Sequence, residues 1–312
     1  MRILKGQTEI DFMGQRRVAV IASALLLLIS FSSLALRGLE FGIDFTGGTL
    51  IEVGYQDSVD IDSVREALTG AGYGDAVVQH FGTSRDVLVR LAEREGVSKA
   101  DISTEVLRAL RADGSGTVDL RRVEFVGAQV GEELTEVGGL AMLIALGAIF
   151  VYVMFRFEWK FSAGAVAALF HDVIITLGFF SILGIEFDLT VLAALLAVIG
   201  YSLNDTIVVF DRIRENFRRI RKGDAVAIVN TSLNQTLART LMTSVTTLLV
   251  LVALFVFGGE LIHGFATALI VGVLIGTYSS IYVASTTTLR LGVSKQDLMP
   301  VEKEGAEIDA KP

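Results

Sequence analysis

The stretch that decides the fold is LTVLAALLAVIGYSLNDTIVVFDRIREN, from Leu189 to Asn216. It begins as an apolar run of membrane-spanning length, and Asn204 and Asp205 lie inside that run. A carboxylate at this depth costs on the order of 2.5–3.5 kcal/mol on insertion scales, so such residues usually face a helix bundle or a wet cavity. Asp205 is therefore a candidate for an ion or proton path. The alternative is a structural aspartate that only hydrogen-bonds to a neighbouring helix.

The composition around this stretch is that of a polytopic membrane protein with some soluble mass, since 52% of the 312 residues are hydrophobic. There is no cysteine, which excludes disulfides, thiolate metal sites and cysteine nucleophiles. The three histidines, His80, His171 and His263, lie far apart without metal-ligand spacing, and no GxxxxGK[ST] loop is present. We expect no enzymatic activity, no cofactor and no metal site.

Six apolar runs have the length that a hydrocarbon core of about 30 Å requires. They are residues 18–36, 138–155, 162–184, 189–210, 240–257 and 264–285. The first run follows basic residues as a signal peptide would, but no small-residue cleavage site follows it, so we interpret it as a retained span. The sequence predicts six transmembrane helices, with helices two to six between 138 and 285.

Charge is segregated along the chain. Residues 37–137 contain 10 Lys/Arg and 19 Asp/Glu, whereas residues 211–239 contain 7 Lys/Arg and 3 Asp/Glu. Further basic residues lie in 1–17 and near Arg156 and Lys160. The positive-inside rule places both termini (1–17 and 286–312) and the basic 211–239 loop in the cytoplasm, and 37–137 outside. The stretch 212–222 is amphipathic and predicts a surface helix.

The segment 37–137 is long enough for one domain. FGIDFTGGTLIEV (41–53) predicts a strand with a Gly-Gly irregularity, and helices are expected at 61–72 and 98–113. Short strands are expected at 75–82, 86–92 and 117–127. The order βαββαβ predicts an extracytoplasmic α+β domain of the ferredoxin-like kind.

The glycine-rich stretch Gly42, Asp44, Gly47 and Gly48 has two interpretations. It could be an anion-binding loop, but single glycine-rich loops are weak signals. We favour a structural role, since glycines permit tight backbone geometry where a helix passes into a strand.

Two further polar sites lie in the apolar runs. His171 and Asp172 are about ten residues into the third span, where they could relay protons or only hydrogen-bond across helices, and these alternatives stay open. Arg239 begins the fifth span, and it is either an interfacial anchor or the counter-ion of Asp205. In the sixth span, small residues recur every four positions and predict a close-packing face: Ala268, Gly272, Gly276, Ser280 and Ala284.

Several motifs together resemble one known family. They are FGIDFTGGTLIEV after the first span, GAQVGEEL before the second, HDV in the third, GYSLNDTIVVFDRIREN in the fourth, GTYSSIYVAS in the sixth and the C-terminal VEKEGAEI. In this combination the chain resembles the SecD/SecF family, and within it the SecF-type accessory subunits of the bacterial Sec protein translocase. The resemblance covers essentially the whole chain.

The resemblance implies a fold of the resistance-nodulation-division type in the cell (inner) membrane. It implies SecD, the SecYEG channel, translocating preproteins and membrane lipids as partners, and no nucleic acid. Proton flow would drive the outer domain and promote preprotein passage, with Asp205 as the proton-responsive carboxylate, Arg239 as its basic partner and Asn204 beside them.

Two other functions compete with this expectation. A proton-coupled small-molecule exporter of related architecture would need a substrate cavity. An intramembrane aspartyl protease would need two opposed carboxylates, for which Asp172 and Asp205 are the candidates.

Overall fold

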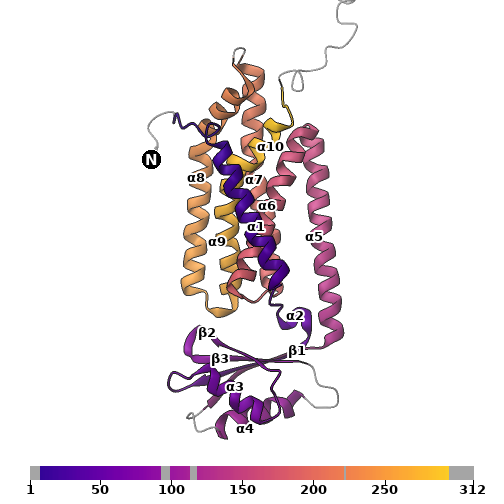
Figure 1. Ribbon diagram of the computed structural model, residues 1–312, viewed down its shortest axis with the longest axis vertical. Helices are drawn as coiled ribbons and strands as arrows, with labels where there is room; N and C mark the ends of the chain where they lie inside the picture. The colour runs from indigo at the N-terminus through magenta and orange to yellow at the C-terminus, as the bar shows by residue number, and fades with distance from the viewer. Residues whose placement is uncertain (1–7, 93–98, 113–117, 221–222, 295–312) are drawn as a thin grey trace, which may run out of the picture.

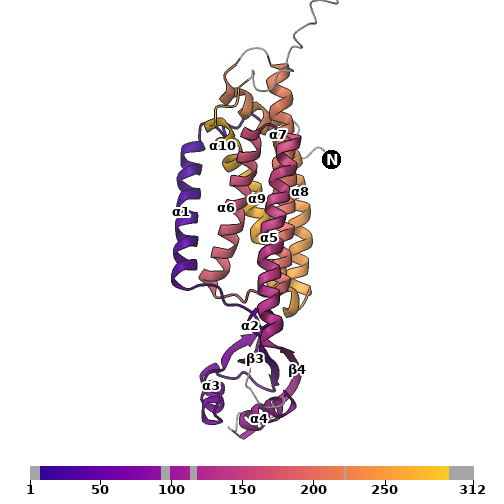
Figure 2. The same cartoon turned by 90° about the vertical axis from the view of Figure 1, so that its right-hand side faces the viewer.

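The computed structural model describes residues 8–92, 99–112, 118–220 and 223–294. It consists of a bundle of long helices and a small α+β domain attached at one end of the bundle (Figures 1 and 2). We call that end of the bundle the sheet end and the opposite one the basic end. The expected tail from 295 onward, including VEKEGAEI, and the first seven residues lie outside the described residues.

The bundle contains the predicted spans. Among the described residues, six helical stretches are long and apolar enough to cross a membrane. They are α1 (Arg16–Leu36), α5 (Ala128–Arg156), α6 (Trp159–Leu183), α7 (Leu189–Arg219), α8 (Ala225–Phe257) and α9 (His263–Ser279), which continues through the π-helical η2 (Ser280–Ala284) into α10 (Ser285–Arg290). The fold class expected from the sequence is confirmed.

Three helices are much longer than the hydrophobic runs that predicted them. Helix α5 begins at Ala128 rather than near 138, α7 continues past Phe210 to Arg219, and α8 begins at Ala225 rather than near 240. The stretch 212–222 is helical as far as Arg219, as predicted, but these residues extend α7 and do not form a separate surface helix. No proline or glycine interrupts this stretch, so the helical hydrogen bonds continue beyond the apolar part.

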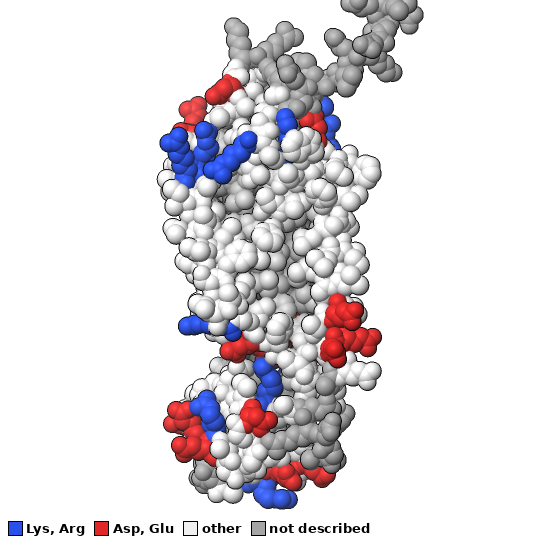
Figure 3. All heavy atoms as spheres, turned by 45° about the vertical axis from the view of Figure 1, so that its right-hand side comes forward, with Lys and Arg blue, Asp and Glu red and all other residues white. Residues whose placement is uncertain are grey.

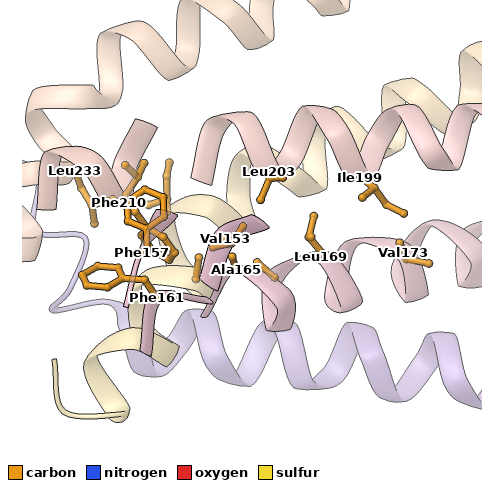
Figure 4. Packing of buried hydrophobic residues seen from close by; sticks show 14 of the residues in the cluster. Val153, Phe157, Phe161, Ala165, Leu169, Val173, Ile199, Leu203, Phe210 and Leu233 are labelled. Carbon is orange, nitrogen blue, oxygen red and sulfur yellow. The ribbon is translucent and has the colours of Figure 1, made fainter. Parts of the chain in front are cut away.

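The bundle core is built around α6 and α7. Near the basic end, the Phe161 and Phe210 rings lie 5.0 Å apart in an edge-to-face arrangement, and Phe157 packs against both (Figure 4). Helix α9 approaches α7 closely, since a Cβ added at Gly272 would lie 2.1 Å from the Val198 side chain. The packing face predicted from the small residues of the sixth span is thus turned to α7.

The α+β domain has the order β1 (Gly48–Tyr55), α3 (Ile61–Gly70), β2 (Val77–Phe81), β3 (Thr83–Leu91), α4 (Lys99–Ala112) and β4 (Val118–Val126). Its antiparallel sheet has the strand order β2-β3-β1-β4, which is the ferredoxin-like arrangement. Helices α3 and α4 cover the face away from the bundle, so the other face of the sheet is turned toward the helices (Figures 1 and 2).

The strand expected from Phe41 begins later than predicted. Residues Ile43–Thr46 form one helical turn, α2, and β1 starts only at Gly48. Gly47 and Gly48 have φ angles of 68° and 124°, which side-chain-bearing residues rarely adopt. At Gly48 a Cβ would also lie 2.3 Å from the Leu91 carbonyl oxygen. The two glycines make the abrupt change from helix to strand.

Candidate functional site

Asp205 lies on α7 at the centre of a small polar cluster. Its side chain is buried, with 5% of the residue exposed. Thr240 Oγ1 of α8 donates to Asp205 Oδ1 at 2.7 Å, and Ser280 Oγ of η2 donates to Asp205 Oδ2 at 2.7 Å. Each carboxylate oxygen therefore has one hydroxyl donor, and the two donors come from two different helices.

Arg239 does not pair with Asp205 as the counter-ion hypothesis requires. Helices α7 and α8 are neighbours, but α8 turns Thr240 to the carboxylate, and the ion pairs among the described residues include none between Arg239 and Asp205. Successive helical residues point about 100° apart, so Arg239 comes to lie on the exposed flank of the bundle. The direct ion pair is not formed in this arrangement, and the role of Arg239 as counter-ion of Asp205 stays a prediction.

Arg239 and Asn204 instead line a crevice between α7 and α8. The crevice has a volume of about 410 Å³ and extends along Asp211 and Glu215 toward the basic end. Asn204 is exposed on this flank, one residue before the buried Asp205. The crevice brings charged and polar groups to the immediate neighbourhood of the buried carboxylate.

A second polar cluster surrounds Asp172, which is 1% exposed. Ser202 Oγ of α7 and Ser279 Oγ of α9 both donate to Asp172 Oδ2, the latter at 2.7 Å. His171 Nδ1 lies 2.9 Å from Asp172 Oδ1, and the imidazole stacks on Tyr278 with ring centroids 6.1 Å apart. The structure thus brings His171 and Asp172 together and joins them to two further helices.

The two clusters meet at the junction between α9 and η2. Ser279 bonds to Asp172 and the next residue, Ser280, bonds to Asp205. π-Helical turns are rare and occur mostly at functional sites. No hydrogen bond joins the two aspartates in the described structure, and they share no donor, which is not the arrangement of an aspartyl-protease dyad.

Sequence reasoning named Ser280 only as a small packing residue and did not name Ser279, although both lie in the motif GTYSSIYVAS. Consecutive hydroxyl residues beside two buried aspartates were the signal that could have revealed them.

The glycine-rich motif forms a junction between the α+β domain and the bundle. Gly42 N donates to Phe187 O at 2.9 Å, and Phe187 N donates to Glu40 O at 2.7 Å. Asp44 Oδ2 accepts the backbone N–H of Leu189 at 3.0 Å, which adds to the N-cap of α7 that Asp188 provides by accepting from Val191 N. A residue of the motif thereby holds the helix that carries Asp205.

Close packing at this junction explains the remaining glycines. Gly47 N donates to Ile43 O, so this N–H is used inside the motif, which supports the structural interpretation rather than the anion-binding loop. A Cβ at Gly131 of α5 would lie 2.8 Å from Gly47 N and from Phe45 O. The Phe45 and Phe187 rings stack with centroids 5.7 Å apart.

A partly buried ion pair joins the sheet to the loop between α6 and α7. Arg90 of β3 lies 2.7 Å from Glu186, and its other Nη donates to Phe41 O at 2.9 Å. Burial raises the pKa of Glu186, and the Arg90 guanidinium offsets part of that rise. In the described part of the chain, no group of three or more His, Cys, Asp or Glu side chains is arranged to hold a metal ion.

These features define a class: a polytopic membrane protein with a ferredoxin-like domain after its first helix and buried carboxylates in its bundle. Residues 106–294 match the family described as "Protein export membrane protein SecD/SecF, C-terminal", and residues 32–59 match the "SecD/SecF GG Motif". The chain belongs to the SecD/SecF family.

Similar proteins carry the name Protein translocase subunit SecF. One from Vibrio alginolyticus is 56% identical over 100% of this chain and 99% of its own length. Others from Pseudomonas aeruginosa and Escherichia coli O157:H7 are 52% and 48% identical, each over 97% of this chain and over 98% and 94% of their own lengths.

The fold also resembles solved structures of SecDF. The crystal structure of SecDF from Thermus thermophilus, described as a translocon-associated membrane protein, is similar with a TM-score of 0.84 and 39% identity over 93% of this chain. A "super-membrane-facing form" of SecDF matches the same share at 38% identity with a TM-score of 0.69. The chain spans 39% of either SecDF chain.

Proposed function

We propose that this chain acts with a SecD-type subunit to use the proton gradient across the cell (inner) membrane and promote preprotein passage through the SecYEG channel. Its family and its relatives support a role in protein translocation. The observation that carries the proton-coupled part is Asp205, a carboxylate buried in an apolar bundle and held by two hydroxyls, with a crevice beside it.

The energy available is sufficient for a switch. One proton that crosses 100 mV supplies about 2.3 kcal/mol, which biases a two-state equilibrium. An ionised Asp205 accepts hydrogen bonds from Thr240 and Ser280, whereas a protonated carboxyl must donate one. Protonation therefore changes the contacts of α8 and η2 with α7. Through Asp44 the change reaches the α+β domain.

The exposed flank of α7 and α8 is the surface proposed for the SecD-type subunit. Arg239 and Asn204 lie among exposed apolar side chains of α8, including Met242 and Val245. A cation on a membrane-facing flank is costly unless a partner or water receives it. A helix that brings an acidic or hydrogen-bonding group to Arg239 would complete the site.

The distribution of charge supports a cytoplasmic basic end. Lys and Arg side chains gather at the end opposite the α+β domain, and Asp and Glu lie around the junction and on the domain (Figure 3). By the positive-inside rule, both termini are cytoplasmic and the α+β domain is outside. Reporter fusions at Asp113 and Lys222, which lie outside the described residues, should be found outside and inside respectively; the reverse result would refute this topology.

The test of the proposed function is preprotein transport into inverted membrane vesicles with and without a proton gradient. Asp205→Asn keeps the size and hydrogen-bonding capacity of the side chain but cannot change its charge. We expect the variant to be inserted and to co-purify with its partners, while the gradient-dependent stimulation of transport is lost. Full stimulation by this variant would overturn the proton-coupled mechanism.

A further inference from the structure

A second pocket lies within the bundle, away from the crevice at Arg239. It has a volume of about 270 Å³ and is enclosed by α1, α6 and the η2–α10 segment. Apolar side chains such as Leu27 and Phe170 form part of the wall. The rest is polar: Ser23, His171, Tyr282, Thr286, Thr287 and Arg290.

Two nearly fully buried polar atoms in this wall have no protein partner. They are His171 Nε2 and Thr286 Oγ1, on residues that are 2% and 4% exposed. His171 Nδ1 is engaged with Asp172 Oδ1, so Nε2 is the ring nitrogen left without a partner among the described residues. Leaving a buried polar atom unsatisfied costs about 1–3 kcal/mol, so a small polar ligand such as water, which can both donate and accept, is favoured here.

The π-helical turn explains why the hydroxyl of Thr286 has no hydrogen-bond partner among the described residues. Ser285 Oγ donates to Ser280 O, five residues back, and Thr288 Oγ1 donates to Ala284 O. Thr286 lies between them and makes neither bond. The altered helix thus presents a hydroxyl to the same pocket as the imidazole of His171.

The pocket is large enough for ordered water. Its volume is many times the roughly 15 Å³ that one ordered water requires, and its polar side chains, set in a wall whose accessible surface is mostly apolar, are the partners that ordered water needs. Arg290 and Thr287, at the end of α10, mark the side toward the basic end. A lipid tail would leave both orphan atoms unsatisfied.

We propose that the pocket between α1, α6 and α10 is a water-filled vestibule that connects His171 to the aqueous phase at the basic end of the bundle. It deepens the proposed function, on which its role as a proton path rests, by giving the His171–Asp172 pair its own access to water. The charged and titratable groups that face His171 there are Asp172, Tyr278, Tyr282 and Arg290.

The natural absence of cysteine makes the hydration of the pocket directly measurable. Single cysteines at Ser23, inside the pocket, and Thr287, at its basic-end side, report on the vestibule. Leu25, 54% exposed on the outer face of α1, and Ser30, 3% exposed where α1 packs on Gly178, are matched controls on the same helix. Each variant is studied as the full chain with its co-expressed partner, in membrane vesicles of both orientations.

The readout is the rate of modification by a membrane-impermeant, charged methanethiosulfonate. The thiolate is the reactive form, so a hydrated cysteine should react at least about tenfold faster than one in lipid or in packed protein. We expect Ser23→Cys and Thr287→Cys to react from the basic-end side faster than Leu25→Cys and Ser30→Cys. Ala24→Phe, which fills the pocket, should slow the reaction at position 23.

A rate at position 23 no higher than at position 25 would overturn the proposal, and so would reaction only from the sheet-end side. The labelling rates do not depend on preprotein transport. Failure of the vestibule is therefore distinguishable from failure of proton-driven export, which the transport assay with Asp205→Asn detects.

Discussion

Asp172 and Asp205 lie on adjacent central helices, yet their surroundings differ. Asp172 has a histidine as its direct neighbour in sequence and contact, and it accepts from two serines. Asp205 has only two hydroxyl donors and lies beside a crevice lined by Asn204 and Arg239. Asp172 is thus surrounded by protein groups and reaches the proposed vestibule only through His171, whereas Asp205 lies next to an exposed flank. Burial alone does not make a carboxylate a switch. Whether it can act as one depends on which polar and charged groups lie near it.

Removing the charge of Arg239 on the exposed flank of α7 and α8 should have the largest effect on transport. Arg239→Met is expected to abolish gradient-dependent stimulation of transport without loss of folding, because Arg239 makes no ion pair within the described chain. Arg239→Lys keeps the charge but loses the planar guanidinium, so partial stimulation is expected.

Arg156→Met is the matched control for Arg239. Arg156 is exposed at the basic end and pairs with Asp211 at 2.8 Å, a contact worth about 0–1 kcal/mol. Transport by this variant should be normal. Equal loss in Arg156→Met and Arg239→Met would mean that the flank at Arg239 has no special role.

Asp172 should contribute more to the stability of the folded protein than Asp205. Asp172→Asn replaces an acceptor of three contacts by a group that must also donate, so it should lower the free energy of unfolding by about 1–3 kcal/mol. Asp205→Asn affects two contacts and should cost less. Thermal unfolding of the purified variants in detergent measures the difference; a greater loss in Asp205→Asn would reverse the comparison.

The serine pair tests whether the two clusters are separate. Ser279→Ala and Ser280→Ala each remove one hydrogen bond to a different aspartate and should each cost about 1 kcal/mol. If the clusters are independent, the double variant shows the sum. We expect a non-additive result, because both serines lie at the start of one π-helical turn and shift together. Strict additivity in thermal unfolding would show two uncoupled sites.

Glu186 is a partly buried carboxylate outside the spans, and its replacement has the smallest expected effect. Its pKa is raised by burial despite Arg90, with Asp188 and Asp44 also near. The folded state therefore binds this proton more tightly than the unfolded state, so the stabilisation is complete below the ordinary value of 4.5 and is lost as the pH rises through the raised pKa. Glu186→Gln should flatten this part of the profile of thermal unfolding against pH. An identical slope in wild type and variant would contradict the assignment.

Much of the architecture was predictable because hydrophobic length and strand order are local properties of the sequence. The six spans and the βαββαβ order along the chain follow from them. That the helices carrying Asp205 and Arg239 are neighbours does not follow from the sequence, and the structure shows it. The pairing of Asp205 with Thr240 and Ser280 was not predictable. It depends on how each helix is rotated about its axis, and helices that are apolar on all sides give little signal of rotation.

The junction shows a second limit of sequence reasoning. In the sequence, Asp44 is only one residue of a glycine-rich motif. Its hydrogen bond to the first turn of α7 joins it to Leu189, 145 residues away along the chain. The short helix α2 and the late start of β1 depend on the same packing against Phe187 and Gly131. Long-range contacts of this kind leave no periodic pattern in the sequence.

Helix α7 is one continuous helix between the two ends of the molecule, and Asp44 joins its first turn to the segment that leads into the α+β domain. Asp205 lies 16 residues beyond Leu189, about 24 Å along the axis, with no proline between them and Gly200 as the single glycine. A continuous helix transmits an axial shift better than a flexible tether does. The carboxylate of Asp205 and the α+β domain are therefore linked through one helix.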